Sequence, residues 1–236
     1  MNIGLLQCDD VGDSLQPKHG NYPEMFGKYF SILDSSVRLR VFDVRKGQYP
    51  AALGDCDAYL TTGSQHGLSD GLDWVERLKG FVRRLDENKV RFVGICFGHQ
   101  LLAEALGGSV ERSPLGWGVG FSENRIVVSR PWMRPVLQNL RLLVSHQDQV
   151  SVLPDRAELF AGSDFCPYYM YGVGEHMLGV QGHPEFTPGY ARDLMRSRLD
   201  RIPPEVVERA EQSLQQGRAD YRVFGEWMLR FFGGGV

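Results

Sequence analysis

Two patterns of apolar residues distinguish helices from strands in the first half of this chain: a spacing of three or four residues, and short continuous runs. The clearest helix covers residues 72–89, where apolar side chains recur every three or four positions and charged side chains occupy the other face. Short apolar runs at 2–7, 57–62 and 91–95 are typical of buried strands. The same patterns predict a strand over 37–42, helices over 22–33 and 98–106, and a polar loop over 9–21.

The hydrophobic pattern changes after the paired glycines Gly107 and Gly108. Strands are predicted over residues 119–129, 140–145, 158–161, 168–173 and 177–181, followed by helices over 188–199, 204–216 and 221–232. Strands that alternate with helices favour a parallel sheet. We therefore expect an α/β fold with three layers, in which a mainly parallel central sheet carries helices on both faces and a small antiparallel addition. A single domain should span residues 1–236.

Composition and charge narrow the possible partners. Apolar residues make up 42% of the chain, which is sufficient for a substantial core, and the formal net charge is −3. Because no basic run reaches five residues, nucleic acid is not expected as a partner. No apolar run approaches membrane-spanning length, and the first ten residues do not resemble a signal peptide. The four cysteines lack metal-type or disulfide-type spacing, so we expect reduced thiols in a cytoplasmic protein.

A glycine-flanked cysteine at a predicted strand-to-helix junction is the strongest chemical signal. In Gly94-Ile95-Cys96-Phe97-Gly98 the two glycines permit the tight, strained turn of a nucleophile elbow. The helix that follows would direct its N-terminus at the sulfur and favour the thiolate. The Phe97 N–H would then be placed to stabilise an oxyanion. This pattern predicts a nucleophilic cysteine.

A second signal, His183-Pro184-Glu185, follows the predicted strand over 177–181. In an extended backbone, side chains two residues apart lie on the same side. Glu185 would then orient His183, and His183 would activate a thiol. The five other histidines show no paired metal-ligand spacing, so no metal site is expected.

Together these motifs resemble the class I glutamine amidotransferases, whose fold is flavodoxin-like. The chain is similar especially to the glutaminase domain of GMP synthetase and to stand-alone γ-glutamyl peptidases. The resemblance implies that Cys96 is the nucleophile, His183 the base and Glu185 its orienter. It also implies that Gly98 and Gln100, at the start of the elbow helix, contact the substrate.

Two further segments correspond to family loops. The first departs from the family's usual sequence, and the second matches a loop that binds glutamine through its backbone. Thr62-Gly63-Ser64 stands where the family usually has Gly-Gly-Pro. The resemblance implies that an N–H of Gly63 or Ser64 completes the oxyanion hole with Phe97. Ser145, His146 and Gln147 match a loop that holds the α-amino and α-carboxylate end of glutamine.

The expected reaction is hydrolysis of the γ-glutamyl amide of glutamine, or of a related small molecule, through a γ-glutamyl thioester. It needs no cofactor. One alternative is a glutaminase subunit that supplies ammonia to a separate synthetase. The sequence contains no ATP-binding motif, which favours the stand-alone hydrolase but is also compatible with an amidotransferase that is split into subunits. Another alternative is a catalytically silent member that binds a ligand or partner.

Overall fold

The computed structural model describes residues 1–234. The strands are β1 (Asn2–Gln7), β2 (Arg38–Asp43), β3 (Ala58–Thr61), β4 (Phe92–Ile95), β5 (Ser109–Arg112), β6 (Gly118–Ile126), β7 (Asn139–His146), β8 (Asp148–Val152), β9 (Ala157–Gly162), β10 (Met170–Val173) and β11 (Met177–Val180). The helices are α1 (Gln16–His19), α2 (Tyr22–Leu33), α3 (Asp73–Glu87), α4 (Phe97–Ala105), α5 (Pro188–Arg196), α6 (Pro204–Gln216) and α7 (Tyr221–Phe232).

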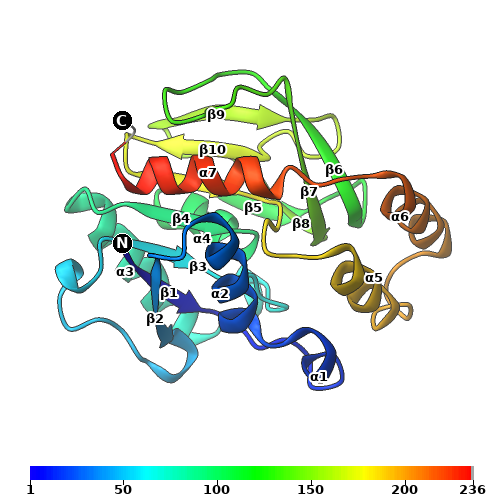
Figure 1. Cartoon of the computed structure of the whole chain (residues 1–236), viewed down its shortest axis with the longest axis horizontal. Helices are drawn as coiled ribbons and strands as arrows, with labels where there is room; N and C mark the ends of the chain where they lie inside the picture. Colours follow the sequence, from blue (N-terminus) through cyan, green and yellow to red (C-terminus); the bar gives the residue numbers. More distant parts are fainter. Residues whose placement is uncertain (235–236) are drawn as a thin grey trace.

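Nine of these strands form one mixed sheet in the order β2-β1-β3-β4-β11-β10-β9-β6-β7. The five strands from β2 to β11 are parallel, and β10, β9, β6 and β7 continue the sheet in antiparallel pairs (Figure 1). Strands β3, β4 and β11 are buried along their whole length. Because both faces of these strands are covered, their sequences are almost continuously apolar and do not alternate.

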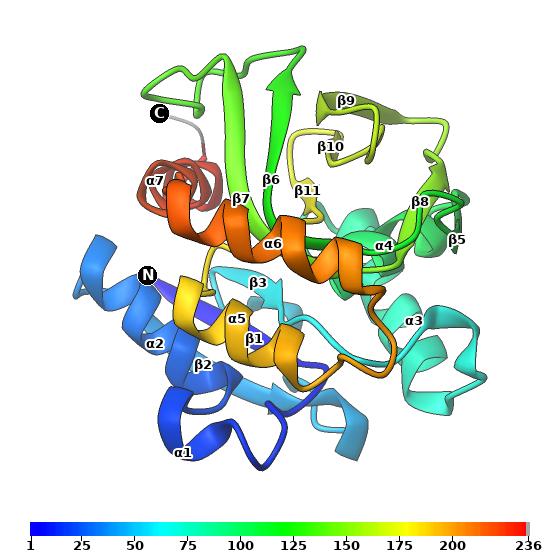
Figure 2. The ribbon, with the colours of Figure 1, turned by 90° about the vertical axis from the view of Figure 1, so that its right-hand side faces the viewer.

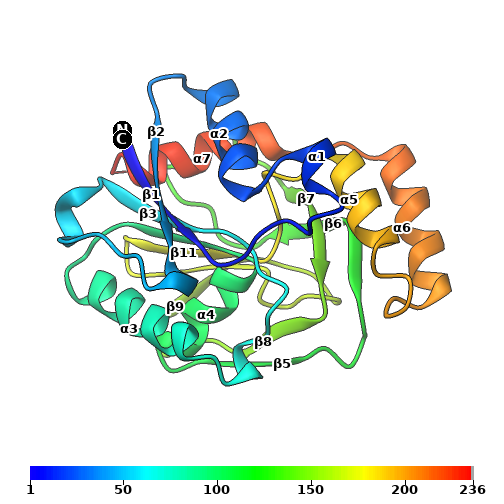
Figure 3. The ribbon, with the colours of Figure 1, turned by 90° about the horizontal axis from the view of Figure 1, so that it is seen from below.

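Helices cover both faces of the sheet, as Figure 3 shows with α3 and α4 on one side and α2 and α7 on the other. Each side has its own hydrophobic cluster. Phe26 and Trp227 belong to one, and Leu78 and Leu101 to the other. Helices α5 and α6 pack on each other and on β6, next to the antiparallel part of the sheet (Figure 2).

The predicted α/β architecture is confirmed, and each predicted strand and helix has a counterpart within a few residues of its expected ends. Three of the α-helices and strands were not predicted, nor were the short 3-10 helices η1 (Val44–Lys46), η2 (Leu53–Asp55) and η3 (Leu68–Asp70). Residues 16–19 of the expected polar loop form the short helix α1, and β5 and β8 pair as a separate two-stranded antiparallel sheet. The antiparallel addition is therefore larger than expected, because four of its strands extend the main sheet.

Candidate active site

The site lies where neighbouring parallel strands end. Strands β3, β4 and β11 are adjacent, and their carboxyl ends lead into Gly63, Cys96 and His183 respectively. Loops at the carboxyl edge of a parallel sheet are the usual place for a ligand site in this class of fold. The topology thus brings together residues that are up to 120 positions apart in the sequence.

Cys96 has the strained backbone expected of an elbow, with φ 49° and ψ −97° between β4 and α4. A non-glycine residue rarely adopts a positive φ, because its Cβ crowds the neighbouring carbonyl. The flanking glycines make the turn possible. A Cβ on Gly94 would overlap the backbone of Gly98, and a Cβ on Gly98 would overlap the side chain of Thr61.

We expect Gly94→Ala to lower the free energy of unfolding by ~3 kcal/mol, because the atoms that its methyl group meets are helix backbone and cannot move aside. The measurement is urea unfolding followed by circular dichroism. Gly80→Ala is the matched control: Gly80 lies within α3, its added Cβ meets nothing within 4 Å, and the change should stabilise the helix by ~0.5–1 kcal/mol. Equal effects of the two substitutions would contradict the packing assigned to Gly94.

His183 and Glu185 form a buried pair, with His183 Nδ1 2.8 Å from Glu185 Oε1. Their side chains are 3% and 0% exposed. The expected contact is present, but the expected extended backbone is not. Strand β11 ends at Val180, residues 184–185 form a turn, and His183 makes a single bridge to Leu143. The His183 N–H donates to the Leu143 carbonyl at 2.8 Å and anchors this turn. The turn therefore brings the side chains of His183 and Glu185 together.

The surroundings of His183 favour its protonated form. Burial alone would lower the pKa of His183, but the charges of Glu185 and of the Cys96 thiolate outweigh it and raise the pKa to about 10. The imidazole also lies close enough to Cys96 for a charge on the sulfur to raise its pKa. Its ring also stacks on Phe186 with centroids 3.8 Å apart, which fixes the ring plane. The arrangement supports an imidazolium at His183, held in place by Glu185 and Phe186.

Gln181 is a site residue that sequence reasoning missed. Its Nε2 donates to Cys96 Sγ at 3.3 Å, and its Oε1 accepts from Gln100 Nε2 at 3.1 Å. Gln100 Nε2 also donates to the Asp148 carbonyl at 2.8 Å. These two buried amides therefore form a chain of hydrogen bonds that ends on the sulfur. The position of Gln181, directly after a buried strand and two residues before His183, was the available signal.

The loop after β3 packs directly against His183. A Cβ on Gly63 would lie 2.7 Å from His183 Cε1, so only glycine fits without moving the imidazole. Within residues 1–234, the N–H groups of Gly63 and Ser64 have no hydrogen-bond acceptor, whereas those of Gln65 and His66 do. The loop thus offers two consecutive free donors, one of them on the residue that packs against the imidazole, and free donors of this kind are what an oxyanion site requires.

A cavity of about 480 Å³ opens beside Cys96. Six of the residues predicted from the sequence line it with Cys96: Ser64, Phe97, Gln100, Ser145, His146 and Gln147. Gly63, Gly98, His183 and Glu185 lie outside this lining. Gly98 is packed against Thr61. The structure therefore gives Gly98 a part in the turn, and its expected substrate contact remains a prediction.

Three arginines that the sequence did not single out also line the cavity: Arg112, Arg198 and Arg201. Arg198 donates to Ser145 Oγ at 2.9 Å, and Arg112 Nε lies 3.6 Å from Asp148 Oδ1. His146 adds no positive charge at neutral pH, because burial lowers its pKa to about 4. The three arginines carry a permanent positive charge in the cavity.

Metal-binding clusters and membrane-spanning helices are both absent from residues 1–234. No group of three or more His, Cys, Asp or Glu side chains in this part of the chain could hold a metal ion. None of its helices combines the length and the apolar character that crossing a membrane requires.

Comparison with known proteins agrees with this geometry. The family model described as glutamine amidotransferase class-I matches residues 63–199, which is more than half of the chain and includes Cys96, His183 and Glu185. The chain therefore belongs to the class I glutamine amidotransferase family, and the expected family and enzyme class are confirmed.

Particular relatives divide into two groups. The chain is 27% identical to gamma-glutamyl peptidase 3 of Arabidopsis thaliana, over 97% of this chain and 94% of that protein. It is 34% identical to a subunit of the glutamine-hydrolyzing GMP synthase of Halobacterium salinarum, over 77% of this chain and 88% of that protein. A solved glutamine amidotransferase from Thermotoga maritima shares the fold, with a TM-score of 0.76, 19% identity and 98% of each chain covered.

Proposed function

We propose that this chain is a cysteine hydrolase that cleaves γ-glutamyl amide bonds through a γ-glutamyl thioester. The observation that carries the proposal is Cys96 on a strained elbow at the end of β4, with a cavity beside it and, after the adjacent strand β11, a histidine bound to a buried carboxylate. These are the parts that covalent acyl transfer requires. We further propose that residues 1–236 act as one domain, since nine of the described strands, from β1 at the start of the chain to β11, share one sheet.

The proposed reaction has two halves. Cys96 Sγ attacks the side-chain carbonyl, and the oxyanion that forms is stabilised by the N–H of Phe97 with that of Gly63 or Ser64. His183 donates its proton to the leaving nitrogen as the C–N bond breaks, which leaves the thioester. Water then attacks the thioester carbonyl and gives its proton to His183. Glutamate leaves, and the thiolate–imidazolium pair forms again.

The cavity supports a substrate larger than glutamine. Its volume of about 480 Å³ falls in the range of pockets that hold drug-sized ligands. Arg198 and Arg201, on the turn after α5, offer guanidinium groups that suit a carboxylate on the leaving group. We therefore favour γ-glutamyl peptides as substrates, which agrees with the similarity to a gamma-glutamyl peptidase.

The purified chain alone should release glutamate from a γ-glutamyl dipeptide faster than from glutamine or γ-glutamyl methylamide. Arg201→Ala should lower kcat/KM for the dipeptide by about tenfold, because a hydrogen bond to a charged group is lost, and should leave glutamine hydrolysis unchanged. Arg83→Ala is the matched control, because Arg83 is exposed on α3, outside the cavity lining. Equal losses on the dipeptide and on glutamine would contradict the role given to Arg201.

The second candidate is a glutaminase subunit that supplies ammonia to a synthetase, favoured by the similarity to a GMP synthase subunit. It predicts a different outcome: no turnover by the chain alone, and glutamine hydrolysis once a synthetase from the same cell is added. For either function we propose a cytoplasmic location, because the four cysteines are buried and unpaired.

A further inference from the structure

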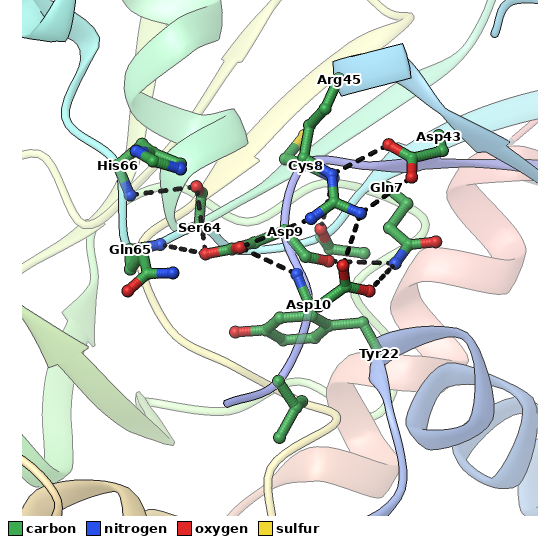
Figure 4. A network of polar contacts seen from close by, with 12 residues as sticks. Gln7, Cys8, Asp9, Asp10, Tyr22, Asp43, Arg45, Ser64, Gln65 and His66 are labelled. Atoms are coloured by element: carbon green, nitrogen blue, oxygen red, sulfur yellow. Dashed lines mark hydrogen bonds and ion pairs between the residues drawn. The ribbon is translucent and has the colours of Figure 1, made fainter. Parts of the chain in front are cut away.

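A buried carboxylate lies directly behind the loop that offers the free N–H groups. Asp9 follows β1, and β1 is the neighbour of β3 in the sheet, so Asp9 and the loop after β3 meet at the same edge. Asp9 Oδ2 accepts from the Gln65 N–H at 2.7 Å and from Ser64 Oγ at 3.5 Å (Figure 4). Asp9 is 5% exposed, although nothing in the reaction above uses it.

The contacts of Asp9 determine which way the loop faces. With the Gln65 N–H bound to Asp9 and the His66 N–H bound to Ser64 Oγ at 3.1 Å, both donors are occupied. The start of the loop is fixed as well, because the Cys8 N–H donates to Thr62 Oγ1 at 2.9 Å. Rotating the peptide planes of the loop would break these bonds. The N–H groups of Gly63, which packs against His183, and of Ser64, which lines the cavity with Cys96, therefore stay unbound.

Arg45 holds Asp9 in turn. This arginine follows β2, and its guanidinium lies 3.7 Å from Asp9 Oδ1, 2.7 Å from Asp10 Oδ2 and 2.8 Å from Asp43 Oδ2 (Figure 4). Three carboxylates gathered without a cation would repel one another. The Arg45 guanidinium hydrogen-bonds to Asp43, contacts Asp10 closely, and attracts Asp9 through its charge over the longer distance.

We propose that Asp9 is a positioning residue for the oxyanion loop, supported by Arg45, and that it pre-forms this loop in the chain on its own. This inference rests on the proposed function. Removal of the Asp9 carboxylate frees the Gln65 N–H and lets the loop turn. The result is a loss of transition-state stabilisation with little loss of substrate binding, since the oxyanion exists only after attack.

The test separates oxyanion stabilisation from thiolate formation. Asp9→Ala should lower kcat for a γ-glutamyl dipeptide by about a hundredfold and leave KM within about twofold. The rate of Cys96 alkylation by iodoacetamide should stay within about twofold of wild type, because that displacement forms no oxyanion. Asp9→Asn keeps an acceptor oxygen for Gln65 and should lose only about tenfold in kcat.

Asp57→Ala is the matched control. The Asp57 carboxylate accepts the Asn2 N–H at 2.7 Å, at the opposite end of the same two strands, so its loss should leave kcat and alkylation unchanged. Parallel losses of kcat and alkylation rate in Asp9→Asn, or an unchanged kcat, would overturn the inference even if Asp9→Ala does not fold. If the wild-type chain is no more active than Cys96→Ala, both the proposed function and this inference are refuted. If the wild type is active and the kcat of Asp9→Asn is unchanged, only this inference is refuted.

Discussion

Cys96→Ala should abolish the release of glutamate from every γ-glutamyl substrate, with a loss of roughly a thousandfold or more, while the chain stays folded. The reason is that the remaining groups can bind and polarise the amide but cannot form the thioester. The measurements are glutamate release and thermal unfolding of the two proteins. Because Cys96 lies in a tight turn and alanine is smaller than cysteine, the fold should tolerate the change.

The other three cysteines provide the controls. Burial raises the pKa of Cys166 to about 12, and it also raises the pKa of Cys8 and of Cys56, so these thiols stay protonated. A glutamine-like alkylating agent should therefore label Cys96 and spare the rest, as mass spectrometry of the digested protein can establish. Full activity in Cys96→Ala, or labelling of Cys166 in its place, would refute the assigned nucleophile.

The parts of the site that could be predicted share a local cause. Gly94, Cys96 and Gly98 lie within five consecutive residues, and the steric limits on a strand-to-helix turn act over that distance. His183 and Glu185 are also close in sequence, so their contact could be expected even though the backbone between them turns. Strands β3, β4 and β11 are buried on both faces, so their sequences are almost continuously apolar. These short apolar runs made the three strands predictable.

The parts that could not be predicted depend on long-range placement. Asp9 and Gln65 are 56 residues apart, and their contact follows from β1 and β3 being neighbours in the sheet. Arg198 reaches Ser145 across 53 residues. An arginine or aspartate in a polar loop has the same local pattern whether it faces solvent or a cavity. The strand β8 was missed because it begins directly after the one-residue gap that follows β7, where the chain passes into a second sheet.

Packing and side-chain hydrogen bonds hold the loop at Thr62-Gly63-Ser64, where the family usually has Gly-Gly-Pro. Gly63 is the position that faces His183, and it is still glycine. Thr62 uses its hydroxyl to accept the Cys8 N–H and to donate to the Gly63 carbonyl at 2.9 Å. Side-chain hydrogen bonds therefore do here what a rigid proline would do elsewhere, which is to fix the backbone of the loop.

His183→Ala should lower kcat by about ten-thousandfold, because His183 both balances the thiolate and moves the proton to the leaving nitrogen. The loss in kcat caused by Glu185→Gln should be about tenfold to a hundredfold smaller than the loss caused by His183→Ala. The imidazole remains in this variant, and only its orientation and the stabilisation of its charge are weakened. Steady-state hydrolysis of a γ-glutamyl dipeptide measures both. Glu175→Gln, an exposed change at the amino end of β11, is the control and should be silent. Near-normal turnover by His183→Ala would refute the role assigned to the histidine.

The pH dependence of kcat/KM, which reports the pKa values of the free enzyme, gives this pair a second test. In the wild type, the Glu185 carboxylate and the Cys96 thiolate, working against burial, raise the pKa of His183 to about 10. The protonated imidazole is the form that donates to the leaving nitrogen, so activity should persist at alkaline pH and fall as the pH rises toward that value. Glu185→Gln removes a negative charge and lowers the pKa of His183, so its activity should fall at a lower pH than in the wild type. If activity falls at the same alkaline pH in the wild type and in Glu185→Gln, Glu185 orients the imidazole without stabilising its charge.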